Sequence, residues 1–416
     1  MTHQHLIRLT AISTTLLAVC LLMGEPVGSH VPITTRITFN REVVRILRQH
    51  CHDCHSPRGV MSSLPLLTYA EARPWAKAIK EEILNRRMSP HQVVKGYGLF
   101  RHDYLISARE QDQLVSWIDG GAPKGDEKDF PAGLIAEMNG PPGWSQGDPD
   151  LILQPAETTR IPPNTANFQR CLTIPVRNQR PLHVSLVDFI PDNGRAIQRA
   201  SIYLAPSRNG AAPQSAKACR LAAARLTQLG EWVPGQRSSI LPSGMARLLP
   251  ARATILLQIE YRGVDQPTTD RSRLGIYLAK GDITHLIETG TLRGSSPSGE
   301  TRIAIEEPIK ENRQIVGIRP LLPSGALSLE ARLLQPDGSS EVLIFARNFR
   351  FDWRPTYYFR VPRPAPAGAR LSITAYTGLR PTPVLCQIIL ARAINPSLMS
   401  TLEDSRPSGT KQKLSE

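Results

Sequence analysis

Thirty-six prolines are spread through this 416-residue chain, and they limit what it can fold into. Proline lacks a backbone N–H, so it interrupts helices and is excluded from most central strands. This content opposes long helical bundles and favours short strands joined by turns. The hydrophobic fraction of 41% is that of an ordinary globular protein, with material for two or three domains.

The net charge of +14 allows several classes of partner. A basic surface can bind nucleic acid, a membrane surface or an acidic protein. The charges are mostly scattered arginines, however, and the nearest thing to a cluster is Arg86-Arg87. No nucleic-acid motif accompanies them, so we expect no nucleic-acid binding, whereas an acidic partner remains compatible with the charge.

Residues 1–30 have the three-part pattern of a secretory signal peptide. A weakly basic start, Met1–Arg8, is followed by an apolar run, Leu9–Met23, and a small polar exit. The apolar run is shorter than the ~20 residues that span a bilayer. Cleavage and export to the periplasm are therefore favoured over a membrane anchor. Lipidation of Cys20 is disfavoured because Val19 stands where a small residue is required.

One motif carries the clearest chemistry, the C-x-x-C-H sequence Cys51-His52-Asp53-Cys54-His55. Two thiols at this spacing can form thioethers with the vinyl groups of haem, and the histidine can be the proximal iron ligand. Thioredoxin-like redox pairs and half zinc sites share the spacing, but no preceding strand pattern or second ligand pair accompanies it. The motif predicts one covalent haem c on Cys51, Cys54 and His55.

Helix signals surround the motif. Asn40 can cap a first helix that leads into it. The pairs Thr68/Glu71 and Ser107/Glu110 are capping-box patterns that open two more helices. Three short helices around a buried haem would form a core over residues 37–126.

The second axial ligand of the iron has to come from further along the chain. Met88 is the main candidate because it follows the second predicted helix, where a loop can turn back over the haem. A thioether there would raise the reduction potential, while His91 would lower it. Met61, His102 and an open sixth site are the remaining alternatives.

Beyond residue 126 the pattern changes. A stretch rich in Gly, Pro and Asp predicts a linker over residues 127–149. Short apolar or alternating stretches then predict strands: Cys171–Val176, His183–Ile190, Ser201–Leu204, Ala253–Tyr261 and Leu343–Phe345. We expect two antiparallel sandwiches, over residues 150–285 and 286–395, and a disordered tail over 396–416.

The chain resembles bacterial copper type II, ascorbate-dependent monooxygenase-like proteins (peptidylglycine monooxygenase-like) that begin with a cytochrome c module. The matching segments include Thr38–Asn40, Leu67–Trp75, Arg87-Met88 with Pro90, Val115–Pro123, Leu257-Gln258, Thr269–Arg273, Pro336–Gly338 and Phe351–Trp353. The resemblance implies a multidomain α plus all-β chain. A small helical class I-like cytochrome c domain would be followed by two jelly-roll-like antiparallel β-sandwich domains. It also implies Met88 as distal ligand, but this chain has Met88–His91 where the family reads Met-Pro-Pro-Trp, so His91 stays an alternative.

Intact members of that family hold one copper in each β domain through histidines and one methionine. The matching positions here are Gln198-Arg199, Glu260–Arg262, Pro320–Pro323 and Val384–Gln387. From residue 145 onward only His183 and His285 remain, and we expect both to be structural. No copper is therefore expected. The replaced positions are either unconstrained surface, or Glu260 and the arginines form a salt-bridged pocket for an anion.

These features predict an exported monohaem c-type cytochrome that transfers one electron to or from a periplasmic partner. The copper-less β module would dock that partner or bind a small ligand that the sequence does not identify. The lost copper ligands argue against an enzyme. A haem-dependent sensor or scaffold, or a residual monooxygenase using electrons from the haem, are the alternatives. Cys171, Cys219 and Cys386 allow one disulfide, with Cys171–Cys386 weakly favoured.

Overall fold

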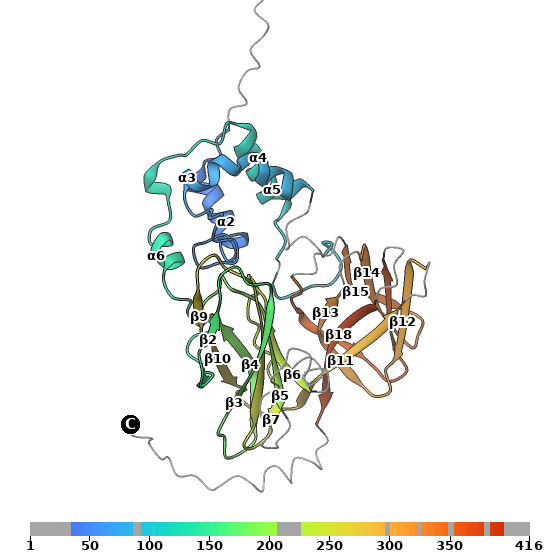
Figure 1. Cartoon of the computed structure of the whole chain (residues 1–416). Helices are drawn as coiled ribbons and strands as arrows, with labels where there is room; N and C mark the ends of the chain where they lie inside the picture. Colours follow the sequence, from blue (N-terminus) through green and yellow to red (C-terminus); the bar gives the residue numbers. More distant parts are fainter. Residues whose placement is uncertain are drawn as a thin grey trace, which may run out of the picture.

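The computed structural model describes residues 35–85, 93–102, 104–205, 226–295, 300–322, 326–347, 353–377 and 383–394. The expected signal peptide and tail, together with Met88, His91 and Cys219, lie outside the described residues. The chain is built mainly of antiparallel β-sheet with a few short helices, as the sequence predicts. In Figure 1 the helical part sits on the end of one sandwich, and the second sandwich lies beside the first.

Short helices make up the part of the chain before residue 140. In chain order they are η1 (Phe39–Val43), α2 (Val44–His50), α3 (Tyr69–Ala72), η2 (Arg73–Trp75), α4 (Ala76–Leu84), α5 (Ala108–Asp119), η4 (Glu127–Asp129) and α6 (Leu134–Asn139). The capping boxes Thr68/Glu71 and Ser107/Glu110 are confirmed. None of the described helices is long and apolar enough to cross a bilayer.

The first helix differs from its prediction. It begins at Phe39 with Thr38 as N-cap, so Asn40 lies inside the π-helical turn η1 and does not cap it. Asn40 is buried, and its side-chain amide donates to the carbonyl oxygen of Asp126 at 2.9 Å. This bond ties the first helix to the segment that follows α5.

The helical part has its own apolar core. Phe39 contacts Tyr69 edge to face at 5.7 Å between ring centroids, and Trp117 is fully buried beside it. Leu134 and Met138 of α6 belong to the same core. The prediction that residues 127–149 are only a linker is therefore wrong, because α6 buries apolar side chains there.

The first sandwich contains strands β1 to β10. They are β1 (Leu151–Leu153), β2 (Thr159–Ile161), β3 (Phe168–Pro175), β4 (Leu182–Ile190), β5 (Ile197–Ala205), β6 (Thr227–Trp232), β7 (Met245–Leu249), β8 (Thr254–Tyr261), β9 (Thr268–Asp270) and β10 (Arg273–Leu278). One sheet has the order β3-β8-β5-β6 and packs on strands β1-β10-β4-β7, while β2 and β9 form a small separate pair.

The second sandwich contains the remaining strands. They are β11 (His285–Ser295), β12 (Arg302–Pro308), β13 (Arg313–Leu321), β14 (Ser328–Leu334), β15 (Ser340–Arg347), β16 (Tyr357–Ala365), β17 (Arg370–Tyr376) and β18 (Pro383–Ala393). The sheet β12-β17-β14-β15 packs on β11-β18-β13-β16. Each of the five stretches predicted as strands lies in an observed strand and extends beyond its end by at most one residue.

Backbone pairing joins these parts in two places within the described residues. Strand β7 pairs in parallel with β11, with Met245 opposite His285, so a single eight-stranded sheet runs through both sandwiches. The segment 93–102 leaves the helical part and lies on the second sandwich, where Val94 N–H donates to Phe345 O at 2.8 Å. Residues 37–126 are therefore not self-contained, because part of this range packs on a distant sheet.

The favoured disulfide is wrong. Cys171 on β3 is disulfide-bonded, but Cys386 on β18 is a free and fully buried thiol. The two segments are both apolar, as predicted, but they belong to different sandwiches.

Candidate functional site

The C-x-x-C-H motif forms the turn that follows α2. The N–H of Cys51 donates to Leu47 O at 2.7 Å, and the N–H of His55 donates to Cys51 O at 2.8 Å. Helical hydrogen bonding therefore continues through the motif. Because residues three apart share one face of a helical turn, Cys51 and Cys54 are presented together, with His55 next to them.

The ring of His55 is oriented by a backbone carbonyl. Its Nδ1 lies 2.9 Å from Leu64 O, and since a carbonyl only accepts, Nδ1 must carry the proton. Nε2 is then the unprotonated nitrogen, the one able to bind a metal. His55 is 5% exposed, and burial lowers the pKa of its imidazole, which favours the neutral form.

His52 has a different environment although it lies in the same turn. It is fully buried, and its Nε2 donates to Leu66 O at 2.9 Å. Burial lowers the pKa of His52 to about 4, so the ring stays neutral. This histidine anchors the loop after the motif, a role that the sequence analysis did not assign to it.

Cys51 does not have the environment of a redox-active thiol. Cys51 is a free, half-buried thiol, and burial, together with the Asp53 carboxylate, raises its pKa to about 12. Redox-active cysteines need the opposite shift, because the thiolate is the reactive form. Within the described ranges, no three His, Cys, Asp or Glu side chains form a group that could hold a metal ion.

The first sandwich contacts the backbone just before and just after the motif. The guanidinium of Arg237 donates to Gln49 O at 2.9 Å, and that of Arg262 donates to Val60 O at 2.6 Å. Gly235 is so close that a side chain there would contact Asp53 and Cys54. The sequence analysis missed these neighbours because they follow the motif by about two hundred residues and carry no local signal.

A cleft of ≈ 450 Å³ runs between the motif and this sandwich. Its walls include Asp53 and Gly59 from the helical part, and Phe189, Trp232 and Gly235 from the sandwich. Burial raises the pKa of the Asp53 carboxyl, against the opposing effect of the nearby arginines. The cleft gives solvent access to the turn that holds the thiols.

Two of the four candidates for the second iron ligand can be located. Met61 follows the motif and is 39% exposed, with its N–H bonded to Cys54 O. His102 lies on the segment that crosses to the sandwiches, and its Nε2 is engaged by Ser238 O at 3.2 Å. Met88 and His91 lie outside the described residues, so the main candidate stays a prediction.

Three of the residues that the sequence analysis compared with copper ligands of the resembled family can be located. Arg199 on β5 pairs with Glu260 on β8 at 3.5 Å, while Arg262 points to the helical part and binds Val60 O. Of the two alternatives for these positions, a pocket that joins Glu260 to both arginines is not formed, because Arg262 is directed elsewhere. The ring nitrogens of His285 lie within hydrogen-bond distance of Thr284 Oγ1 and Gln314 Nε2.

Comparison with known proteins gives no family for this chain: no family model matches it, and neither does any curated protein. Among solved structures it is similar to the major capsid protein P2 from bacteriophage PM2, with 10% identity, 59% of this chain and 98% of that chain covered, and a TM-score of 0.29. The STIV MCP gives 10% identity, 60% and 98% coverage and a TM-score of 0.29. Likenesses this weak carry no argument about function.

Proposed function

We propose that this chain is an exported, periplasmic monohaem c-type cytochrome that transfers single electrons. The haem would be attached through Cys51 and Cys54, with His55 as proximal ligand of the iron. Residues 37–126 would be the class I-like cytochrome c domain of the family that the sequence resembles. The two sandwiches would be its jelly-roll-like β module, without copper.

The observation that carries the proposal is the bond between His55 Nδ1 and Leu64 O. Histidines that bind metals generally donate their other ring nitrogen to a carbonyl or carboxylate, which fixes the tautomer and raises the basicity of the ligating nitrogen. His55 meets this requirement within nine residues of the motif. The lowered pKa of its ring acts in the same direction, because protons compete less well for Nε2.

The two thiols fit covalent attachment better than redox exchange. They lie on one face of a helical turn, and the raised pKa of Cys51 keeps it protonated at neutral pH. A bound haem would supply the one-electron iron couple that such a protein uses. Cys51 and Cys54 would hold the group in place, and His55 would set its orientation and potential.

The β module is assigned the docking role because it lies against the motif. Arg237 and Arg262 join it to backbone oxygens on both sides of the motif. The excess of positive charge favours an acidic redox partner. Met88 is proposed as the distal ligand, with His91 as the alternative.

The test is expression of the full chain in cells that attach haem c, followed by visible spectra and haem staining of the denatured protein. We expect haem that stays bound after denaturation and a low-spin spectrum. The double variant Cys51→Ala/Cys54→Ala should lose this haem completely. Cys386→Ala, which removes a free thiol far from the motif, should retain it.

The spectra also test the axial ligands. A far-red Met–Fe band that is unchanged by carbon monoxide and lost in Met88→Leu supports Met88 and electron transfer. Binding of carbon monoxide by the unmodified protein would favour the sensor alternative. Absence of covalent haem in the unmodified protein would overturn the proposal.

A further inference from the structure

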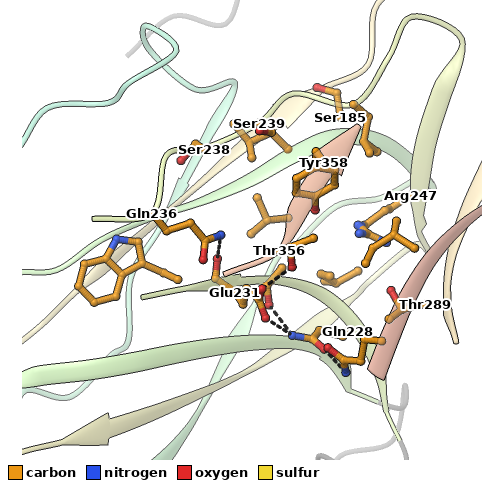
Figure 2. Close-up of a pocket in the computed structure, with 18 residues that line it drawn as sticks. Ser185, Gln228, Glu231, Gln236, Ser238, Ser239, Arg247, Thr289, Thr356 and Tyr358 are labelled. Atoms are coloured by element: carbon orange, nitrogen blue, oxygen red, sulfur yellow. Dashed lines mark hydrogen bonds between the residues drawn. The ribbon is translucent and has the colours of Figure 1, made fainter. Parts of the chain in front are cut away.

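A small polar cavity of ≈ 50 Å³ lies where the two sandwiches meet (Figure 2). Its walls come from β4, β6 and β7 of the first sandwich, from β11, β16 and β18 of the second, and from the segments that adjoin them. A water occupies about 10–15 Å³ of such a cavity, so there is room for about three to five atoms of that size.

Arg247 on β7 lines this cavity and is 7% exposed. Its Nη1 atom is buried and has no hydrogen-bond partner, and none of the ion pairs found among the described residues includes Arg247. Arginine cannot lose its proton in a protein. A guanidinium buried without an ion-pair partner is unfavourable, so a counter-charge is expected at this position.

The only carboxylate among the described residues of the cavity wall does not supply that charge. Glu231 forms a buried pair with Arg319, both side chains being 4% exposed, and it also accepts from Thr356 and Gln228. Figure 2 shows Glu231 beside Thr356 and Gln228, with Arg247 apart from them. Glu231 is therefore already neutralised, while Arg247 is not.

Hydroxyl groups also line this cavity. Ser239 is buried, and its Oγ has no hydrogen-bond partner in the described structure. Tyr358 and Thr289 line the same space, and Figure 2 shows them beside the guanidinium. A forked cation with neutral hydroxyl donors around it is the chemistry that binds a planar oxyanion.

We propose that this cavity binds a small planar oxyanion of three or four heavy atoms, with Arg247 as its counter-charge and Ser239 as a donor. Nitrate, bicarbonate and acetate have this chemistry and this size. The inference is independent of the haem, because none of the motif residues lines the cavity.

The test is isothermal titration calorimetry of the full-length protein with sodium nitrate, sodium bicarbonate and sodium acetate, at constant ionic strength in a buffer free of oxyanions. We expect saturable 1:1 binding of at least one of them. The anion with the highest affinity of the three is then the one that the cavity prefers. Arg247→Met should weaken binding at least about tenfold. Arg293→Met, which removes an exposed arginine of β11, should leave it unchanged.

Absence of saturable binding of all three anions to the unmodified protein would overturn the proposal, and so would equal affinity in Arg247→Met. Citrate is too large for the cavity, so citrate binding as tight as that of nitrate would also contradict it. If Arg247→Met does not fold, Arg247→Lys keeps the charge without the forked geometry. A loss of about threefold or more in that variant supports the site, and unchanged affinity counts against it.

Discussion

Two histidines of one turn differ in which ring nitrogen carries the proton, because they contact different backbone carbonyls. His52 donates through Nε2 to Leu66 O, whereas His55 donates through Nδ1 to Leu64 O, both at 2.9 Å. The nitrogen left without a proton therefore differs between the two rings. In His52 it is the buried Nδ1, and in His55 it is Nε2. The loop that follows the motif thus decides which nitrogen of each ring stays unprotonated.

The buried pair of Glu231 and Arg319 gives a prediction at the level of single side chains. Glu231→Gln removes the charge that compensates Arg319 in the interior, so the free energy of unfolding should fall by about 3–5 kcal/mol in chemical denaturation. The matched control is Glu330→Gln in the partly exposed pair with Arg332, with a loss below about 1 kcal/mol. Equal losses in the two variants would contradict this reasoning.

Sequence reasoning finds the residues of the candidate site whose chemistry depends on local spacing. Cys51, Cys54 and His55 follow from the motif alone. The carbonyl of Leu64 and the guanidinium of Arg237 do not, because their contacts depend on how a loop and a distant strand connection return to the motif. No composition or periodicity encodes such contacts.

Among the elements, those with strong local signals are predictable. The sequence predicts the capping boxes before α3 and α5 and five of the strands, β3, β4, β5, β8 and β15. Asn40 misleads because its side chain serves a long-range bond to Asp126 in place of a cap. The helix α6 is not predicted because the sequence around it is rich in Gly and Pro. Leu134 and Met138 nevertheless have helical spacing.

The N-terminus of α5 provides a prediction for one element. Ser107 accepts from Glu110 N–H, and Glu110 in turn accepts from Ser107 N–H at 2.8 Å. Ser107→Ala should therefore lower the free energy of unfolding by about 1 kcal/mol. Ser116→Ala, on the exposed side of the same helix, should change it little. A thermal melt of both variants checks this, and an equal effect would exclude a capping role.

For the whole molecule, the main feature is that the parts are interlocked. One eight-stranded sheet passes through both sandwiches, and the segment 93–102 carries the helical part onto the second of them. This arrangement could not be derived from the sequence, since the segment lies between two predicted helices and its partners are some 250 residues further on. It implies that the helical part and the second sandwich lose structure together.

Phe100 tests that coupling, because its ring lies 5.2 Å from Tyr357 and 5.1 Å from Phe359 between centroids. Phe100→Ala should lower the free energy of unfolding by about 2–3 kcal/mol, since it opens a cavity beside a buried cluster. Leu99→Ala is the control, because Leu99 is 62% exposed. Hydrogen exchange followed by mass spectrometry should show that the second sandwich and the segment 93–102 open together in the unmodified protein. In Phe100→Ala, amide hydrogens of both regions should exchange faster. Faster exchange confined to the segment would mean that it rests on the sheet without stabilising it.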